Sequence, residues 1–520
     1  MNLEGRSIIG SRRGQGDELV GQSINPATGA GLEPAYVAAS PDELDQAAQL
    51  AAQAFDVYRH VPGTRKAAFL RAIAEHIEAS LEALVERTPL ETGLPEMRVR
   101  GETARTCAQL RMFADLVEEG SWVDARIELA KPDREPLPKP DLRSMQRPLG
   151  PVAVFAASNF PLAFSTAGGD TASALAAGCP VIVKAHSSHS GTSEIVGLAI
   201  QKAVRECGLP EGVFSLVYGS GRSTGQALVN HPAIKAVGFT GSFAGGRALM
   251  DLAASRETPI PVYAEMSAVN PVVILPGAAR ERGDQISQGL YASMTLGVGQ
   301  FCTNPGLVFV QEDDAGTIAG AVAELVSAGT GATMLNAGIC AAYGSGLEAL
   351  ESHSSVTTVA RAALGEGSNQ AVAALFRTTA DAFLEHPELK AEVFGPATII
   401  VSYRDDTELA KLFDDLEGQL TASVHGAGED LSSRQPLLQL MEDRAGRLVF
   451  NGFPTGVEVC TAMVHGGPYP ATSDGRSTSV GTMAIHRFTR PVSWQDCPDP
   501  QLPEELKSSN PLGIQRKEVH

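Results

Sequence analysis

The sequence predicts an α/β protein with two or more domains, each built around a parallel sheet. Its 520 residues exceed the size that one hydrophobic core usually serves. From Pro151 onward, short apolar runs alternate with helical stretches, which is the pattern of βαβ units. Much of the glycine, 53 residues in all, lies in turn-like clusters between those runs. These observations favour parallel strands joined by crossover helices.

The N-terminal part from residue 40 to 116 is helical in pattern. Ser40, Pro41 and Asp42 form a helix start, with a capping side chain followed by proline at the first helical position. Alanine and leucine then recur at helical spacing. The segment 131–141 is rich in proline and charge, so we expect an extended linker or a crossing to another domain or subunit.

The alternating region follows. We expect strands at 151–158, 180–186, 214–219 and 236–241, with helices between them. A second apolar set follows Pro259 and comprises PVYAEM, PVVILP, GLVFVQ, ATIIVSY and RLVFNG. Two lobes are therefore expected to meet before Glu265. The polar tail after Pro498 is expected to wrap a surface or to stay mobile.

Composition excludes several classes of protein. Hydrophobic residues make up 43% of the chain and charged residues 19%, as in a soluble globular enzyme. The net charge of −19 repels nucleic acid and anionic membrane, so neither is an expected partner. Seven scattered cysteines show no CxxC pair, so we expect neither a metal site nor a disulfide framework. With no signal-peptide or membrane-spanning run, a reducing cytoplasm is the expected location.

Three residues are candidates for covalent chemistry. Cys302, in GVGQFCTNPG, has small and polar neighbours that predict a loop or helix start open to a substrate, as a nucleophile requires. Glu265 lies at a strand end and is a candidate general base. Asn159 follows an apolar strand, where its amide can face a developing oxyanion. Taken singly, each has an ordinary alternative: an inert core cysteine, a surface or cap carboxylate, and a turn asparagine.

Six motifs together carry a resemblance to the aldehyde dehydrogenase superfamily, from about Asp42 to His486. They are Asn159-Phe160-Pro161, PVIVKAHSS, Phe239-Thr240-Gly241-Ser242, Glu265, Cys302 and Glu392-Val393-Phe394-Gly395-Pro396. The chain departs from the family in having Ala157-Ser158 where Pro-Trp is usual. It also has Met266-Ser267-Ala268 where Leu-Gly-Gly is usual. Because the reacting side chains are present, we interpret the chain as a divergent branch.

The resemblance implies a fold with a Rossmann-like cofactor domain, an α/β catalytic domain and a small oligomerisation element in a homodimer or homotetramer. The implied ranges are 1–130 and 148–258 for the dinucleotide-binding domain, 259–470 for the catalytic domain, 131–147 and 484–500 for oligomerisation or bridging, and 501–520 for the tail.

The resemblance also implies roles for single residues. Cys302 resembles the nucleophile, Asn159 an oxyanion donor beside the Cys302 N–H, and Glu265 the base that activates water. The cofactor-binding candidates are Lys184, Ser187, Arg222, Ser242, Glu392 and Phe394, of which Glu392 resembles the carboxylate on the nicotinamide ribose. The substrate-binding candidates are Phe160, Phe164 and Arg111, the last as a cation for the substrate carboxylate.

The cofactor that the resemblance implies is NADP, with NAD as a weaker alternative. Members of the family that prefer NAD tend to carry a glutamate at the position of Ser187, and its absence removes a charge that repels a 2′-phosphate. Arg222 falls where some NADP-linked members place an arginine, whose planar donors match a phosphate. Without Ser187 and Lys184 beside it, Arg222 would be an ordinary exposed loop charge.

His465, in MVHGGPYPAT, is shared with a small branch of the superfamily that includes bacterial 2-oxoglutarate semialdehyde and fatty aldehyde dehydrogenases. There it is placed near Cys302 to tune the thiolate or move a proton, and a packed loop histidine is the alternative. This branch implies oxidation of 2-oxoglutarate semialdehyde (2,5-dioxopentanoate) to 2-oxoglutarate. The alternatives are oxidation of medium- or long-chain aldehydes, a coenzyme A-acylating reaction, and an inactive binding or structural protein that retains the fold.

Overall fold

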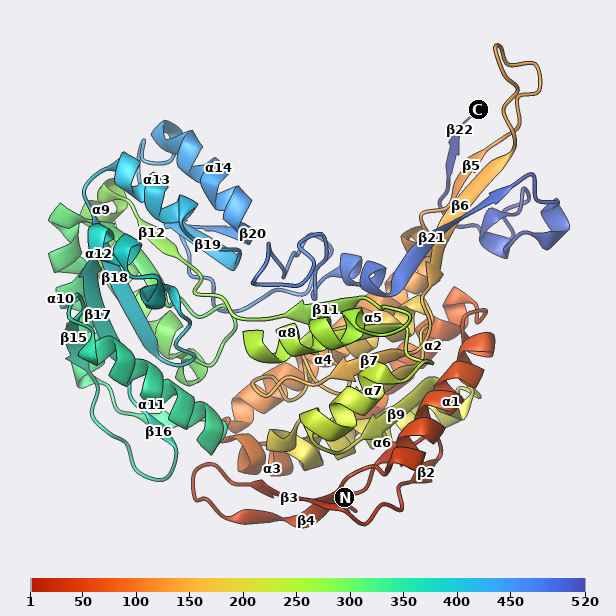
Figure 1. Cartoon of the computed structure of the whole chain (residues 1–520), viewed down its shortest axis with the longest axis horizontal. Coiled ribbons are helices and arrows are strands. Elements are labelled where there is room, and N and C mark those ends of the chain that lie inside the picture. Colours follow the sequence, from red (N-terminus) through yellow and green to blue (C-terminus); the bar gives the residue numbers. More distant parts are fainter. Residues whose placement is uncertain (1, 520) are drawn as a thin grey trace.

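The structure, a computed structural model, describes residues 2–519 and divides into two α/β lobes and a projecting arm (Figure 1). The first lobe contains the N-terminal helices and one seven-stranded sheet, and the second contains another seven-stranded sheet. The arm, at the upper right of Figure 1, carries the C-terminal end of the chain. The predicted α/β class with two parallel sheets is confirmed.

The sheet of the first lobe has the strand order β11-β10-β7-β8-β9-β1-β2. The strands from β11 to β9 are parallel, and β1 and β2 extend the edge in the antiparallel sense. The strand bounds are Ile8–Ile9 (β1), Arg12–Arg13 (β2), Val152–Phe155 (β7), Val181–Lys184 (β8), Phe214–Val217 (β9), Ala236–Thr240 (β10) and Val262–Glu265 (β11). The central strands are almost wholly buried and mainly apolar, because helices cover both faces of the sheet.

The helices of this lobe are Pro41–Tyr58 (α1), Gly63–Ala79 (α2), Leu81–Thr92 (α3), Glu96–Glu119 (α4), Gly169–Ala177 (α5), Ser190–Glu206 (α6), Gln226–Asn230 (α7) and Phe243–Ala254 (α8). Helices α2, α4, α5 and α6 pack on the face of β7 that carries Val152 and Val154. Helices α1, α7 and α8 cover the face that carries Ala153 and Phe155. The predicted helix start is confirmed, because Ser40 and Glu43 form a reciprocal capping box ahead of α1.

The predicted division between the lobes at residues 258 and 259 is wrong by several residues. β11 pairs in parallel with β10 along its whole length and is the edge strand of the first sheet. The run PVYAEM therefore belongs to the first lobe, and the chain crosses to the second lobe only after Glu265. Apolar content cannot show this, because a strand that ends one sheet has the same pattern as a strand that begins the next.

The sheet of the second lobe has the order β15-β17-β18-β13-β12-β19-β20, and only β15 is antiparallel to its neighbour. The strand bounds are Val272–Ile274 (β12), Leu307–Gln311 (β13), Thr357–Arg361 (β15), Ala374–Thr379 (β17), Ala397–Tyr403 (β18), Gln419–His425 (β19) and Ala445–Phe450 (β20). The helix bounds are Pro276–Thr295 (α9), Glu312–Ala328 (α10), Ala337–Ser352 (α11), Ala380–Glu385 (α12), Asp406–Asp414 (α13) and Gln435–Arg444 (α14). Separate apolar clusters fill the two faces of this sheet.

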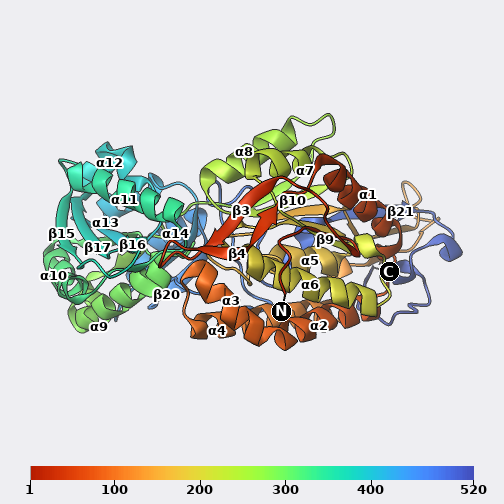
Figure 2. The ribbon, with the colours of Figure 1, turned by 90° about the horizontal axis from the view of Figure 1, so that it is seen from below.

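A hairpin joins the two lobes near the N-terminus. Its strands are Leu19–Ile24 (β3) and Gly31–Val37 (β4), and Figure 2 shows them running across the first lobe toward the second. In the second lobe, Asn369 donates a side-chain hydrogen bond of 2.8 Å to the Pro26 carbonyl at the hairpin turn. A small sheet of Ala332–Thr333 (β14) and Gln370–Ala371 (β16) supports this contact.

The arm is a four-stranded sheet of order β21-β6-β5-β22. Its strands are Arg126–Glu128 (β5), Leu142–Pro148 (β6), Thr489–Gln495 (β21) and Lys517–Val519 (β22). One correction follows, because the arm takes in residues 126–128, which we had expected in the cofactor domain. The tail packs on a surface, which is one of its two expected alternatives. Leu502, Leu506 and Ile514 are buried in the core cluster of the first lobe, and β22 pairs in parallel with β5.

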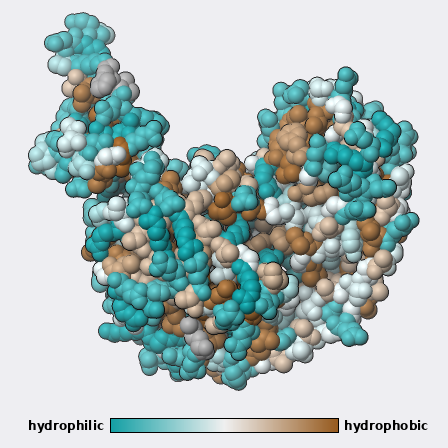
Figure 3. All heavy atoms as spheres, turned by 180° about the vertical axis from the view of Figure 1, so that it is seen from behind, coloured by the Kyte–Doolittle hydropathy of each residue, from teal (hydrophilic) through white to brown (hydrophobic). Residues whose placement is uncertain are grey.

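Figure 3 shows the arm standing clear of the body, with hydrophilic side chains over most of its visible face. Among the described residues, no helix has both the length and the apolar character needed to cross a membrane.

Candidate active site

A cavity of about 960 Å³ is lined by both lobes. The first lobe contributes the last residue of each of four strands, β7, β8, β10 and β11, and parallel sheets commonly bind ligands at these carboxyl ends. The second lobe contributes the start of α11 and the loop before β18. Most of the predicted site residues line this one cavity, namely Asn159, Lys184, Ser187, Ser242, Glu265, Cys302, Glu392 and Phe394.

Cys302 lies on a tight loop between α9 and β13, as its small neighbours predicted. Gly297, Val298 and Gly299 before it all have positive φ. Gly299 has to be glycine, since a Cβ there would lie 2.3 Å from the backbone carbon of Gly395. Behind the thiol, Asn270 donates a 2.9 Å hydrogen bond from Nδ2 to the Cys302 carbonyl. The loop is thereby held with the side chain facing the cavity.

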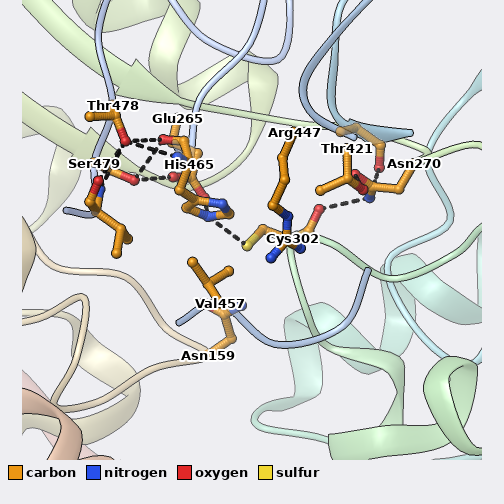
Figure 4. A network of polar contacts seen from close by, with 12 residues as sticks. Asn159, Glu265, Asn270, Cys302, Thr421, Arg447, Val457, His465, Thr478 and Ser479 are labelled. Atoms are coloured by element: carbon orange, nitrogen blue, oxygen red, sulfur yellow. Dashed lines mark hydrogen bonds and ion pairs between the residues drawn. The ribbon is translucent and has the colours of Figure 1, made fainter. Parts of the chain in front are cut away.

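The thiol of Cys302, the imidazole of His465 and the carboxylate of Glu265 lie together (Figure 4). Nε2 of His465 lies 3.4 Å from Sγ of Cys302 and 3.0 Å from Oε1 of Glu265. The Ser479 hydroxyl donates a 2.8 Å hydrogen bond to Oε2 of Glu265. Glu265 is the last residue of β11, as predicted, and both it and His465 are fully or nearly fully buried. The fold therefore brings the predicted nucleophile, base and histidine together.

The pKa values of Glu265 and Cys302 are shifted in opposite directions. Burial alone would raise the pKa of the Glu265 carboxyl, but the contacts with His465 and Ser479 outweigh it and lower this pKa to about 2. Burial raises the pKa of the Cys302 thiol, and the neighbouring Glu265 carboxylate raises it further. Before a ligand binds, the site therefore holds a neutral thiol beside an ionised carboxylate.

Donors for an oxyanion lie next to Cys302. Within residues 2–519, the Cys302 backbone N–H has no hydrogen-bond acceptor. Asn159 is 9% exposed and lines the same cavity, and its Nδ2 donates one 3.0 Å bond to the Gln300 carbonyl. Because an amide nitrogen carries two hydrogens, one donor on Asn159 is left for another acceptor.

Aromatic rings form one wall near the thiol. The rings of Phe160 and Phe164 have centroids 5.2 Å apart, and Phe160 is also 5.2 Å from Phe301. The Phe164 ring lies 5.9 Å from the imidazole of His465. The two predicted phenylalanines are thus adjacent to the reacting group, while Phe301, next to Cys302 in sequence, was missed.

The other end of the cavity suits a dinucleotide phosphate. Lys184 has no carboxylate within ion-pair distance among the described residues, and burial lowers its pKa to about 8. Ser242 caps α8 by accepting a 3.2 Å hydrogen bond from the Gly245 N–H, so a helix N-terminus opens on the cavity. Ser187 lies on the same wall, and Arg222 is exposed directly after the cavity residue Gly221.

Glu392 and Phe394 close the cavity from the second lobe. Burial raises the pKa of the Glu392 carboxyl to about 7, against the opposing effect of hydrogen bonds from Ser267 and the Ala268 backbone. A carboxyl group that is close to neutral can approach ribose hydroxyls without repelling a nearby phosphate. The cavity as a whole fits a nicotinamide dinucleotide, with cationic and helix-terminal groups at one end and Cys302 at the other.

The structure contradicts the expectation for Arg111. This residue lies on the outer side of α4, where its guanidinium makes a two-pronged ion pair with Glu78 at 2.6 and 2.7 Å. Two other arginines contact the site instead. Arg105, also on α4, lies over the Phe164 ring at 5.3 Å, and Figure 4 shows Arg447 of β20 beside Cys302. The seven-residue spacing from Arg98 to Arg105 was a sequence signal for one shared helix face.

Cys302, Glu265 and His465 also offer ligand atoms within 4.8 Å of one another, as a metal site does. His353, His386 and Glu388 form a second such group on the second lobe. Neither could be found from the spacing of cysteines and histidines, because each set gathers residues that are distant in sequence.

A cysteine thiol beside a buried carboxylate, in a cavity between two α/β lobes that fits a dinucleotide, is an arrangement that can carry out oxidation through a thioester. The model of the aldehyde dehydrogenase family matches residues 14–491, and the chain belongs to that family.

Two curated relatives match nearly the full length. The alpha-ketoglutaric semialdehyde dehydrogenase 2 of Azospirillum brasilense is 51% identical over 518 residues, covering 99% of each chain. The alpha-ketoglutaric semialdehyde dehydrogenase of Acinetobacter baylyi is 46% identical, covering 98% of this chain and 97% of the relative. Among solved structures, the betaine aldehyde dehydrogenase of Staphylococcus aureus in complex with NAD+ superposes with a TM-score of 0.81 at 18% identity, covering 96% of both chains. A putative aldehyde dehydrogenase of Burkholderia cenocepacia gives 0.80 at 20% identity, covering 94% of this chain and 99% of that one.

Proposed function

We propose that the protein oxidises 2-oxoglutarate semialdehyde, also called alpha-ketoglutaric semialdehyde, to 2-oxoglutarate. The observation that carries this proposal is the similarity to the two alpha-ketoglutaric semialdehyde dehydrogenases at 51% and 46% identity. Both alignments cover 98% or more of this chain, so they include the loops around Cys302 as well as the cofactor cavity. The product carries one more negative charge than the substrate, which calls for cations near the thiol.

The first chemical step is attack of the Cys302 sulfur on the aldehyde carbon. Nε2 of His465, which lies 3.4 Å from Sγ and 3.0 Å from the Glu265 carboxylate, takes the thiol proton as the carbon–sulfur bond forms. The oxygen becomes an anion that accepts hydrogen bonds from the Cys302 N–H and the free donor of Asn159. A bound nicotinamide would supply the hydride acceptor for this step, and loss of the hydride from the tetrahedral carbon would leave a thioester on Cys302.

Hydrolysis of the thioester is the second step. Glu265, ionised above a pKa of about 2, removes a proton from water as the oxygen attacks the thioester carbon. The carbon–sulfur bond then breaks, 2-oxoglutarate leaves, and His465 returns its proton to the Cys302 thiolate. Ser479 and His465 hold the carboxylate in position through its two oxygens. The presence of this buried base favours water as the acceptor, rather than the thiol of coenzyme A, and it also argues against an inactive protein that only retains the fold.

NADP is the proposed cofactor, with NAD used more weakly. Lys184 and Arg222 supply two cations near the expected adenosine 2′-position, and Ser187 supplies no opposing carboxylate. Ser242 and the start of α8 would hold the pyrophosphate through backbone N–H groups. Glu392 would hold the nicotinamide ribose, with Phe394 beside it on the cavity wall.

We also propose that the arm pairs with a second subunit in a homodimer or homotetramer. Its sheet stands clear of the body and offers unpaired strand edges at β21 and β22. The seven cysteines are all free, which fits a reducing cytoplasm.

A substrate panel with both cofactors tests the proposed function. Purified protein is assayed with 2-oxoglutarate semialdehyde, pentanal and dodecanal, each with NADP and with NAD, by absorbance of the reduced cofactor. We expect kcat/KM for the semialdehyde with NADP to exceed all other combinations by at least about tenfold. A preference for dodecanal would favour a fatty aldehyde dehydrogenase, and no turnover of any aldehyde would contradict the proposal.

A further inference from the structure

Two arginines from opposite lobes meet at one loop beside the thiol. Arg105 of α4 donates a 3.3 Å hydrogen bond from Nη2 to the Val457 carbonyl. Arg447 of β20 donates from Nη1 to the Gly456 carbonyl at 2.9 Å and from Nη2 to the Pro454 carbonyl. The loop 454–457 is thus held from both sides, and Figure 4 shows Val457 and Arg447 on either side of Cys302.

Both arginines are half-buried, and among the described residues each has a buried guanidinium nitrogen without a hydrogen-bond partner. Nη1 of Arg105 and Nε of Arg447 are buried without a hydrogen-bond partner in the part of the chain that the structure describes. Burial lowers the pKa of both arginines. For Arg105 the Glu102 carboxylate and then the thiolate form of Cys302 oppose this shift, and for Arg447 the thiolate form of Cys302 opposes it. A buried cation without an anionic partner is costly, so a site of this kind calls for an anion.

The other arginines of α4 all pair with carboxylates, so an arginine without such a partner is unusual in so acidic a chain. Arg98 pairs with Glu102 and Arg111 with Glu78, and Arg100 pairs with Glu82 and Glu96. Within residues 2–519, Arg105 is the arginine of this helix that has no carboxylate within ion-pair distance, and Arg447 has none either. Their nearest protein acceptors are neutral carbonyls of one loop.

Glu102, the nearest carboxylate along the helix, already has partners for both of its oxygens. Its Oε1 accepts hydrogen bonds of 2.9 Å from the backbone N–H groups of Leu162 and Ala163, and its Oε2 pairs with Arg98 at 3.2 Å. It therefore cannot turn toward Arg105 without breaking the contacts that hold the loop after Asn159.

We infer that Arg105 and Arg447 bind the carboxylate of the substrate while its aldehyde end is held at Cys302. This inference rests on the proposed function. The substrate carries its carboxylate at the opposite end of a short chain from the aldehyde, and a planar guanidinium offers a carboxylate two parallel donors. Phe164, which lies between Arg105 and His465, packs against the methylene groups of that chain.

This arrangement also explains selectivity. An uncharged aldehyde of the same length would displace water from the two guanidinium groups and leave them unpaired. Sites built to pair a polar group discriminate strongly against an analogue that lacks it. The free-energy penalty for binding pentanal should therefore be larger than the value of one lost hydrogen bond.

The test uses Arg105→Met and Arg447→Met, which keep an apolar stem and remove the charge. The matched control is Arg111→Met, on the same helix but paired with Glu78 at the surface. Initial rates are measured with 2-oxoglutarate semialdehyde and with pentanal at saturating NADP. Thermal unfolding and NADPH fluorescence establish that each variant is folded and binds cofactor.

We expect the ratio of kcat/KM for the semialdehyde to that for pentanal to fall about 10- to 100-fold in each site variant, mainly through KM. This range corresponds to the loss of one charge-assisted hydrogen-bonded pair. The ratio should not change in Arg111→Met. Arg105→Lys should recover part of the loss, because a charge without the planar fork remains.

Three other outcomes have separate meanings. If the wild-type enzyme prefers pentanal or dodecanal, the proposed function itself fails, whatever the variants do. If it prefers the semialdehyde and the ratio is unchanged in both methionine variants, the carboxylate lies elsewhere and this inference fails alone. If both substrates slow equally while the pH dependence of Cys302 alkylation by iodoacetamide shifts upward, the arginines act on the thiolate, and the inference is again overturned.

Discussion

Nε2 of His465 lies 3.4 Å from Sγ of Cys302. The same nitrogen is 3.0 Å from the Glu265 carboxylate, while Nδ1 of the ring is buried with no partner among residues 2–519. A single ring nitrogen therefore faces both the thiol and the carboxylate, and its proton can serve only one of them at a time. We expect His465 to control which of the two groups carries the proton.

The thiol is the group that should be indispensable. Replacing Cys302 with alanine should abolish aldehyde oxidation and leave the dissociation constant of NADPH nearly unchanged, because among residues 2–519 no other cysteine lines the cavity. The measurement is steady-state turnover alongside NADPH fluorescence titration. Cys207→Ala, a half-buried cysteine at the end of α6, is the control and should behave as wild type. More than trace turnover in the Cys302 variant would contradict the covalent mechanism.

Glu265 should matter most after the hydride has left. We expect Glu265→Gln to give a rapid burst of reduced cofactor, close to one per site, followed by slow turnover, because hydrolysis is the step that needs the base. Stopped-flow absorbance at saturating aldehyde and NADP separates the two phases. If the burst is lost as well, Glu265 is needed to deprotonate Cys302, and His465 becomes the candidate for the hydrolytic base.

Ser479 should set the acid limit of the reaction. Its hydroxyl donates to the ionised form of Glu265, so Ser479→Ala should raise the pKa of that carboxyl from about 2 by about one to two units. A base must be unprotonated to act, so the rate is lost as the pH falls through this pKa. A raised pKa therefore moves the loss of activity to higher pH.

The measurement for this prediction is kcat as a function of pH under conditions where the protein stays folded. Adding His465→Asn should move the acid limb further upward than Ser479→Ala alone, because burial then acts on Glu265 with less opposition. Ser493→Ala, which removes a hydroxyl in the arm, should leave the profile in place. Identical profiles for all variants would mean that another group limits the rate at low pH.

Cofactor preference should depend on Arg222 and Ser187. We expect Arg222→Ala to raise KM for NADP by about one to two orders of magnitude, the value of a charge-assisted hydrogen bond, and to leave KM for NAD almost unchanged. Ser187→Glu should go further and reverse the preference, because it repels the 2′-phosphate and offers ribose hydroxyls an acceptor. The control is Arg247→Ala, an exposed arginine on α8 that pairs with Asp251. Equal losses for both cofactors in the Arg222 variant would place its side chain away from the phosphate.

Much of the site follows from local sequence patterns. The strand that carries Lys184, the strand end at Glu265, the loop of Cys302 and the helix start at Ser40 were all predicted, because each depends on a few consecutive residues. A parallel sheet then gathers strand ends at one edge without further information. Cys302, Glu265 and Asn159 therefore line one cavity as expected.

Other features were decided only when the chain folded. The sequence determined that α4 is helical, but not which of its arginines faces the site. Arg105 and Arg111 differ by six positions, a rotation of about 240° beyond one full turn, so their side chains leave the helix on different sides. Packing of α4 against α2 directs Arg111 outward to Glu78. Likewise, the residue pattern of PVYAEM predicts a strand, but only the pairing with β10 shows that this strand belongs to the first sheet.

The contacts of Ser479, Arg447 and β22 had no signal in the sequence at all. Each depends on segments that are distant in the chain, such as Ser479 and Glu265, which are 214 positions apart. Apolar periodicity records which side of an element is buried, because burial is a property of single residues. It does not record what lies opposite, because that is set by how whole sheets and helices pack, and so the partners of the buried charges were decided by the tertiary structure.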